Sequence, residues 1–101
     1  MRRRFFEKVS VPPYVLAREL DGESILLNLD SGVYYGLDEV GTRMWTVLTE
    51  SESIGVAYET LLAEYAVEPD ELRADLTRLV GELLEQGLLA SAAAGSGDDG
   101  G

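Results

Sequence analysis

Residues 31–45 constrain the fold more than any other segment, because a short strand pattern there runs directly into a helix pattern. The strand is expected over residues 33–37, after a turn signal at Asp30-Ser-Gly32. Side chains of a strand point alternately to its two faces. We therefore expect the core face to carry Val33, Tyr35 and Leu37, and the opposite face to carry Tyr34 and Gly36.

Two further strand patterns precede this segment, over residues 14–20 and 24–29. Asp21-Gly22 lies between them and is a strong signal for a tight hairpin turn. Apolar residues recur at every other position of the second strand, so we expect that set to face the core. The set consists of Ile25, Leu27 and Leu29.

Three helix patterns follow the strands. Asp38 is a good N-cap for the first helix, and Ser51 or Ser53 can cap the second. The stripe of the first helix contains Val40, Met44, Val47 and Leu48, with Trp45 at its margin. The stripe of the second contains Ile54, Ala57, Tyr58, Leu61, Leu62 and Tyr65.

The third helix is predicted to begin at Pro69, a residue favoured in the first turn of helices. Its apolar stripe contains Leu72, Leu76, Leu79, Val80, Leu83 and Leu84. Gly87 can adopt the left-handed conformation that ends a helix, which lets Leu88 fold back toward Leu83.

This order of elements predicts an α+β fold of the winged helix-turn-helix type, with a three-stranded antiparallel sheet followed by three helices. A chain of 101 residues forms one domain. We expect residues 1–8 to form a flexible basic N-terminus, residues 9–90 the folded domain, and residues 91–101 a disordered tail rich in Ala, Gly, Ser and Asp.

Composition leaves little room for catalysis. The chain contains neither cysteine nor histidine, which removes thiolate nucleophiles, imidazole bases and zinc sites built from these residues. Its carboxylates do not follow the spacing of a calcium-binding loop. We therefore expect no enzyme activity, no metal and no cofactor. The sequence has no apolar run that could span a membrane and no signal peptide, so the expected location is the cytoplasm.

The charge distribution argues against nucleic acid as a partner. Residues 9–101 hold four arginines against 18 acidic residues, a net charge of −14. The predicted third helix and the residue before it carry six acidic residues and two arginines, whereas a DNA-reading helix needs a cationic face. We therefore expect no specific binding of duplex DNA, and a DNA-binding regulator ranks last among the functions considered.

The predicted topology offers a binding site for a peptide. The strand at residues 33–37 is the last of the sheet, so one of its sides presents unpaired N–H and C=O groups. An extended peptide can pair with such an edge, and the third helix beside it would form the wall of a groove. One face of that helix carries Arg73, Leu76, Thr77 and Val80, although core packing alone also accounts for Leu76 and Val80.

Several segments in order closely resemble the PqqD-like family of peptide-recognition elements. They are residues 30–45, the run Leu-Leu-Ala-Glu-Tyr-Ala-Val at 61–67, the pair Asp75-Leu76, and Leu-Leu-Glu-Gln-Gly-Leu-Leu at 83–89. The resemblance covers roughly residues 9–90 and is greatest to the free-standing leader-binding proteins of lasso-peptide biosynthesis.

This resemblance implies a non-enzymatic protein that binds the leader segment of a ribosomally made precursor peptide. The leader would add as a strand between the third strand and the third helix, for delivery to a transglutaminase-like cysteine leader peptidase and an ATP-dependent macrocyclase. By position, the peptide-binding residues are Gly32, Val33, Tyr34, Tyr35, Gly36, Arg73, Leu76, Thr77 and Val80. The alternative is an acidic winged-helix adaptor or regulator that binds another protein.

Overall fold

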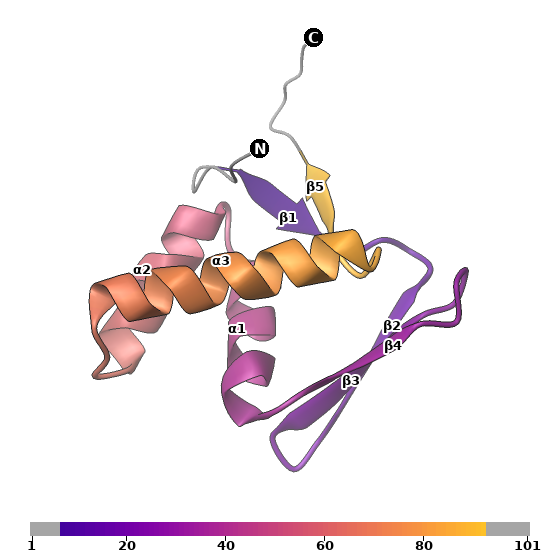
Figure 1. Cartoon of the computed structure of the whole chain (residues 1–101), viewed down its shortest axis with the longest axis horizontal. Helices are drawn as coiled ribbons and strands as arrows, with labels where there is room; N and C mark the ends of the chain where they lie inside the picture. The colour runs from indigo at the N-terminus through magenta and orange to yellow at the C-terminus, as the bar shows by residue number, and fades with distance from the viewer. Residues whose placement is uncertain (1–6, 93–101) are drawn as a thin grey trace, which may run out of the picture.

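The computed structural model describes residues 7–92 of the chain. Its elements are, in order, β1 (Lys8–Ser10), β2 (Val15–Leu20), β3 (Glu23–Asn28), β4 (Tyr34–Leu37), α1 (Glu39–Glu50), α2 (Ile54–Glu64), α3 (Pro69–Glu85) and β5 (Ala90–Ala92) (Figure 1). The α+β class, with an antiparallel three-stranded sheet followed by three helices, is confirmed.

The sheet has the strand order β2-β3-β4, with both neighbouring pairs antiparallel. Asp21 and Gly22 join β2 to β3, and both have positive φ angles, 55° and 84°. Positive φ angles at both central residues are typical of a type I′ turn, whose twist matches that of the flanking strands in a hairpin. The sequence indicates a hairpin turn at the same place. β3 is thus the central strand, and β2 and β4 each leave one edge without a strand partner.

Local signals also set the ends of the helices. The Asp38 carboxylate accepts the backbone N–H of Gly41 at 2.8 Å and caps α1. Ser53, not Ser51, caps α2 through its hydroxyl. Gly87 ends α3 with a φ angle of 72°, and the Leu88 N–H then donates to the Leu83 carbonyl at 2.8 Å, as expected. Within residues 7–92, no helix is long and apolar enough to cross a membrane.

The core lies between the helices and one face of the sheet. The predicted stripes of α2 and α3 are buried or partly buried, but one expectation for α1 needs correction. Val40 is exposed, whereas Met44, Val47 and Leu48 are buried together with Trp45 at the margin of the stripe. The inward face of α1 therefore begins after its first turn.

The two ends of the described chain pair with each other. β1 and β5 form a separate two-stranded antiparallel sheet in which Val9 lies opposite Ser91 (Figure 1). The backbone carbonyl of Glu7 also accepts the N–H of Ile54 at 2.8 Å. Residues 7, 8, 91 and 92 were thus wrongly assigned to flexible termini, since pairing across some eighty residues leaves no local signal. Residues 1–6 and 93–101 lie outside the described residues.

The facing of β3 is the main correction. Ile25 and Leu29 are exposed and Leu27 is partly exposed, whereas Ser24, Leu26 and Asn28 are buried in their place. The Ser24 hydroxyl is hydrogen-bonded to the Thr42 hydroxyl of α1 at 2.8 Å. The Asn28 amide donates to the carbonyls of Gln86 and Gly87, each at 3.2 Å. Partners on α1 and in the turn that ends α3 therefore satisfy the buried polar side chains and fix the orientation of the strand.

Candidate binding groove

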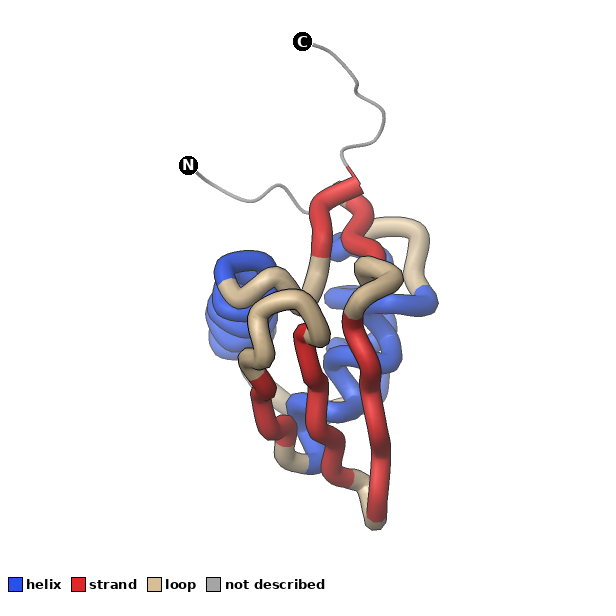
Figure 2. The backbone as a smooth tube through the Cα atoms, turned by 90° about the vertical axis from the view of Figure 1, so that its right-hand side faces the viewer, coloured by secondary structure: helices blue, strands red, loops and turns tan. Residues whose placement is uncertain are grey.

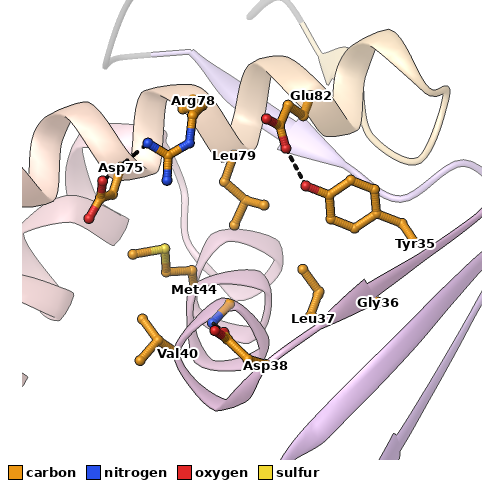
Figure 3. A pocket seen from close by; sticks show the side chains of 11 residues that line it. Tyr35, Gly36, Leu37, Asp38, Val40, Met44, Asp75, Arg78, Leu79 and Glu82 are labelled. Atoms are coloured by element: carbon orange, nitrogen blue, oxygen red, sulfur yellow. Dashed lines mark hydrogen bonds and ion pairs between the residues drawn. The ribbon is translucent and has the colours of Figure 1, made fainter.

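A cleft of about 440 Å³ opens between β4, the first turn of α1 and the middle of α3 (Figure 3). The strand and the residue after it contribute Tyr35, Gly36, Leu37 and Asp38; the helices contribute Val40, Gly41, Met44, Asp75, Arg78, Leu79 and Glu82. A groove between the last strand of the sheet and α3 is the location that the topology predicts.

The strand wall of the cleft carries unused backbone groups. The Asn28 N–H donates to the Val33 carbonyl at 2.8 Å, so these opposed residues form a hydrogen-bonded pair. Such pairs alternate with non-bonded pairs along an antiparallel ladder. The N–H and C=O groups of Tyr35 and Leu37 consequently point to β3, and those of Tyr34 and Gly36 point to the free edge. This edge can accept an added strand.

The floor of the cleft is apolar. Leu37, Met44 and Leu79 form it, and Val40 is 47% exposed at its rim. Gly41 allows α1 to approach the strand this closely, because a Cβ at that position would lie 3.2 Å from the Leu37 Cδ2 atom. The cleft can therefore receive apolar side chains of a bound segment, with the burial of apolar surface as the driving force.

The helix wall is polar. Asp75, Arg78, Leu79 and Glu82 occupy one face of α3 with the spacing i, i+3, i+4 and i+7. The Arg78 Nη1 atom lies 3.4 Å from the Asp75 Oδ1 atom, and both side chains are well exposed. Exposed ion pairs of this kind contribute little to stability. Asp75 and Arg78 can therefore separate and pair with charged groups of a ligand instead.

A hydrogen bond connects the two walls. The Tyr35 hydroxyl of β4 donates to the Glu82 Oε1 atom of α3 (Figure 3). This bond to Glu82 raises the pKa of Tyr35, and burial of the phenol and the negative charge of Glu82 act in the same direction. The bond holds α3 at a fixed distance from the strand at one end of the cleft.

The five predicted strand residues take different positions. Tyr35 and Gly36 line the cleft, and Tyr34 lies on the opposite face of the sheet with its backbone on the free edge. Val33 directs its carbonyl to Asn28, and the N–H of Gly32 donates to the Asn28 carbonyl at 2.8 Å. Gly32 and Val33 thus belong to the turn that leads into β4.

The helix wall of the cleft is shifted by two positions along α3 from the predicted one, so the two sets share no residue. Leu76 and Val80, 0% and 1% exposed, are core residues and cannot contact a ligand in the cleft. Arg73 and Thr77 are exposed but do not line the cleft. Sequence reasoning missed Asp75, Arg78, Leu79 and Glu82 as wall residues, because the apolar stripe of α3 has two flanks. No local pattern indicates which flank faces β4.

The fold and the edge groove define a small domain suited to binding an extended segment, and comparison with known proteins gives its family. The sequence model of the family described as Coenzyme PQQ synthesis protein D (PqqD) matches residues 23–89. This match spans the sheet from β3 and all three helices, so the chain belongs to the PqqD family, as its sequence motifs indicate.

Two solved structures share the fold. One is described as TbiB1 in complex with the TbiA(beta) leader peptide; it is 31% identical, with a TM-score of 0.73 over 88% of this chain and 99% of that chain. The other, lasso peptide synthetase B1 complexed with the leader peptide, is 26% identical, with a TM-score of 0.72 over 81% of this chain and 96% of that chain. No curated protein matches the sequence significantly.

Proposed function

We propose that this protein binds the leader segment of a ribosomally made precursor peptide as an added strand on the free edge of β4. The observation that carries the proposal is the unpaired backbone of Tyr34 and Gly36 beside an apolar cleft. The family match and two similar proteins that hold leader peptides support it. Strand addition is a recurring mode of peptide recognition.

Backbone groups and side chains contribute differently to peptide recognition. Hydrogen bonds to Tyr34 and Gly36 set the register of the peptide, and they tolerate most side chains. Alternate peptide side chains enter the cleft, where Val40, Met44 and Leu79 select apolar groups. Charged groups of the peptide meet Asp75, Arg78 and Glu82 of α3. Apolar burial supplies most of the affinity, and the polar wall supplies selectivity.

The protein presents the peptide and does not modify it. Each carboxylate of the cleft already has a partner: Asp38 caps α1, Asp75 pairs with Arg78, and Glu82 accepts from Tyr35. Tyr35 carries the one hydroxyl among the residues that line the cleft, and Glu82 raises its pKa, which is the opposite of the activation that a nucleophile needs. Chemistry on the bound peptide therefore belongs to separate enzymes.

We place this role in lasso-peptide biosynthesis, in the cytoplasm where the precursor is made. The partners would be a transglutaminase-like cysteine leader peptidase and an ATP-dependent macrocyclase. Support comes from the solved structure described as a lasso peptide synthetase B1, which shares the fold over 81% of this chain. Nucleic acid is excluded from the proposed partners, because the exposed side of α3 is acidic.

The test is a titration of candidate leader peptides into wild-type protein and two matched variants. Val40 and Val56 are 47% and 46% exposed, and each lies in the first turn of its helix. Only Val40 lines the cleft. Val40→Asp should weaken leader binding by at least about 10-fold, the size of loss seen when a residue that contributes strongly to an interface is replaced. Val56→Asp should leave leader affinity unchanged. Equal affinities for the two variants would contradict the site.

Hydrogen exchange tests the bound geometry. Leader binding should slow exchange at the amides of Tyr34 and Gly36 and change that of Tyr35 little, because Tyr35 already bonds to β3.

Two arginine variants test the helix wall. Arg78→Glu should alter leader affinity, and Arg73→Glu should not. Equal slowing of exchange at all three amides, or a change of leader affinity in Arg73→Glu alone, would contradict the proposed site.

A further inference from the structure

The outer face of the β2-β3-β4 sheet is apolar and uncovered. Within residues 7–92 no helix crosses it, as Figure 2 shows. Register places Leu16, Leu27 and Tyr34 side by side in one row across the three strands. Ile25 lies in the next row, with Leu20 at the hairpin end, and most of these side chains are more than half exposed. A contiguous patch of this kind marks an interaction surface.

One end of this face is hollowed. A depression of about 600 Å³ lies there, and Leu20 and Ile25 are among the residues that line it. It exists because Gly36 stands opposite Ile25 and has no side chain; a Cβ at Gly36 would meet no atom within 4 Å. The depression can take up a large apolar side chain from another molecule.

The depression adjoins the peptide groove across β4. Gly36, Leu37 and Asp38 line both hollows, one on each side of β4. A strand added to β4 would widen the outer face by one strand, and every second peptide side chain would lie beside Tyr34. A molecule docked on this face would therefore touch the protein and the bound peptide together.

Charge identifies the class of molecule that fits. Acidic residues lie at the depression: Glu23 and Asp38 line it, and the Glu39 side chain lies against Gly22 of the β2-β3 turn, next to Asp21. Arg18 is the one cation among the eight residues that line the depression. A second copy of this face would meet like charges, which oppose its association. The complementary surface has an apolar centre and a rim of lysine and arginine.

We propose that this outer face docks a partner protein with such a surface, and that the partner is an enzyme acting on the bound leader. The inference rests on the proposed function, since a partner docked beside the peptide groove is placed to act on the peptide bound there. Docking here places the enzyme on the opposite side of β4 from α3. The leader, paired with the edge of β4, then lies at the rim of their interface.

The experiment uses the purified cysteine leader peptidase of the peptide's own pathway as the probe. Ile25→Ser and Leu20→Ser remove apolar surface from the face; Val56→Ser is the matched control on α2. Peptidase association is measured by calorimetric titration with and without the leader, after leader affinity has been measured for each variant. We expect the face variants to bind the leader normally and to weaken peptidase association by at least about 10-fold.

Salt and charge reversal give a second readout. Raising salt from ~50 to ~300 mM should weaken wild-type association, because it screens the acidic rim. Glu23→Lys should weaken association and flatten its salt dependence. Peptidase association that is unchanged in Ile25→Ser and Leu20→Ser would overturn the inference.

Two other outcomes are equally decisive. A wild-type dimer in sedimentation that Ile25→Ser dissociates would assign the face to a second copy and overturn the inference. Failure of the wild-type protein to bind any leader would refute the proposed function, and the leader titration detects this separately. The face can still be tested in that case, because association is also measured without the leader.

Discussion

The two faces of the central strand β3 invert the usual rule of polar surface and apolar core. The buried face carries Ser24 and Asn28 on either side of Leu26, and the open face carries Ile25 and Leu27. Leu26 is 0% exposed and Ile25, its neighbour, is 56% exposed. Burial of the polar pair is tolerated because each side chain is hydrogen-bonded within the fold.

The difference separates two uses of the same strand. Hydrogen bonds from the inner face join β3 to α1 and to the end of α3, so this face positions the two helices that flank the groove. The outer face carries Ile25 and Leu27, whose side chains have no hydrogen-bonding group, and within residues 7–92 no helix crosses it. Substitutions on the inner face should therefore change stability, and substitutions on the outer face should change association.

The largest effect is expected from Leu26→Ala. Removal of a fully buried leucine side chain loses its transfer free energy and leaves a cavity, which lowers the free energy of unfolding by about 2–5 kcal/mol. Urea denaturation followed by circular dichroism measures the change. A loss below about 1 kcal/mol, the level of an average substitution, would show that the inner face is not the packed one.

Asn28→Leu should have the next largest effect. The two side chains are similar in volume, but leucine cannot donate to Gln86 and Gly87 or accept the N–H groups of Asp30 and Ser31. Buried groups left without partners cost about 1–3 kcal/mol of unfolding free energy. Urea denaturation gives the cost, and hydrogen exchange should show faster exchange at the Asp30 and Ser31 amides. A more stable variant would mean that the buried amide serves no structural role.

Tyr35→Phe should cost about 1 kcal/mol near pH 8, since it removes the hydrogen bond to Glu82. The raised pKa of Tyr35 fixes the sign of the pH dependence. Above the unfolded value near 10, the unfolded state loses its proton while the folded state keeps it, so stability falls as pH rises. The advantage of wild type over Tyr35→Phe should therefore shrink between pH 8 and pH 11 in urea denaturation. A growing advantage would contradict the bond.

Local signals explain what the sequence could predict. Asp21-Gly22, Asp38, Pro69 and Gly87 each act through their own backbone or first-turn contacts, and the elements begin or end where these residues indicate. The edge position of β4 beside α3 also follows from the order of elements. For this reason the location of the cleft, and the resemblance to the family, could be predicted.

Long-range contacts decided the rest. Leu26 interrupts the alternation of β3, so either face could have been the inner one, and the choice depends on Thr42, Gln86 and Gly87. The rotation of α3 about its axis likewise depends on how α1 and β4 pack against it. For this reason Arg78 lines the cleft and Arg73, the predicted wall residue, does not. Pairing of β1 with β5 needs both ends of the domain.

The smallest effect on stability is expected from Ile25→Thr, which sharpens the comparison with its neighbour Leu26. Threonine keeps the β-branched shape favoured in strands, and the side chain is more than half exposed, so the free energy of unfolding should change by less than about 0.5 kcal/mol. Urea denaturation of both variants under one set of conditions measures the contrast. If Ile25→Thr cost as much as Leu26→Ala, the apolar outer face would be part of the core, and its exposure would need no partner to explain it.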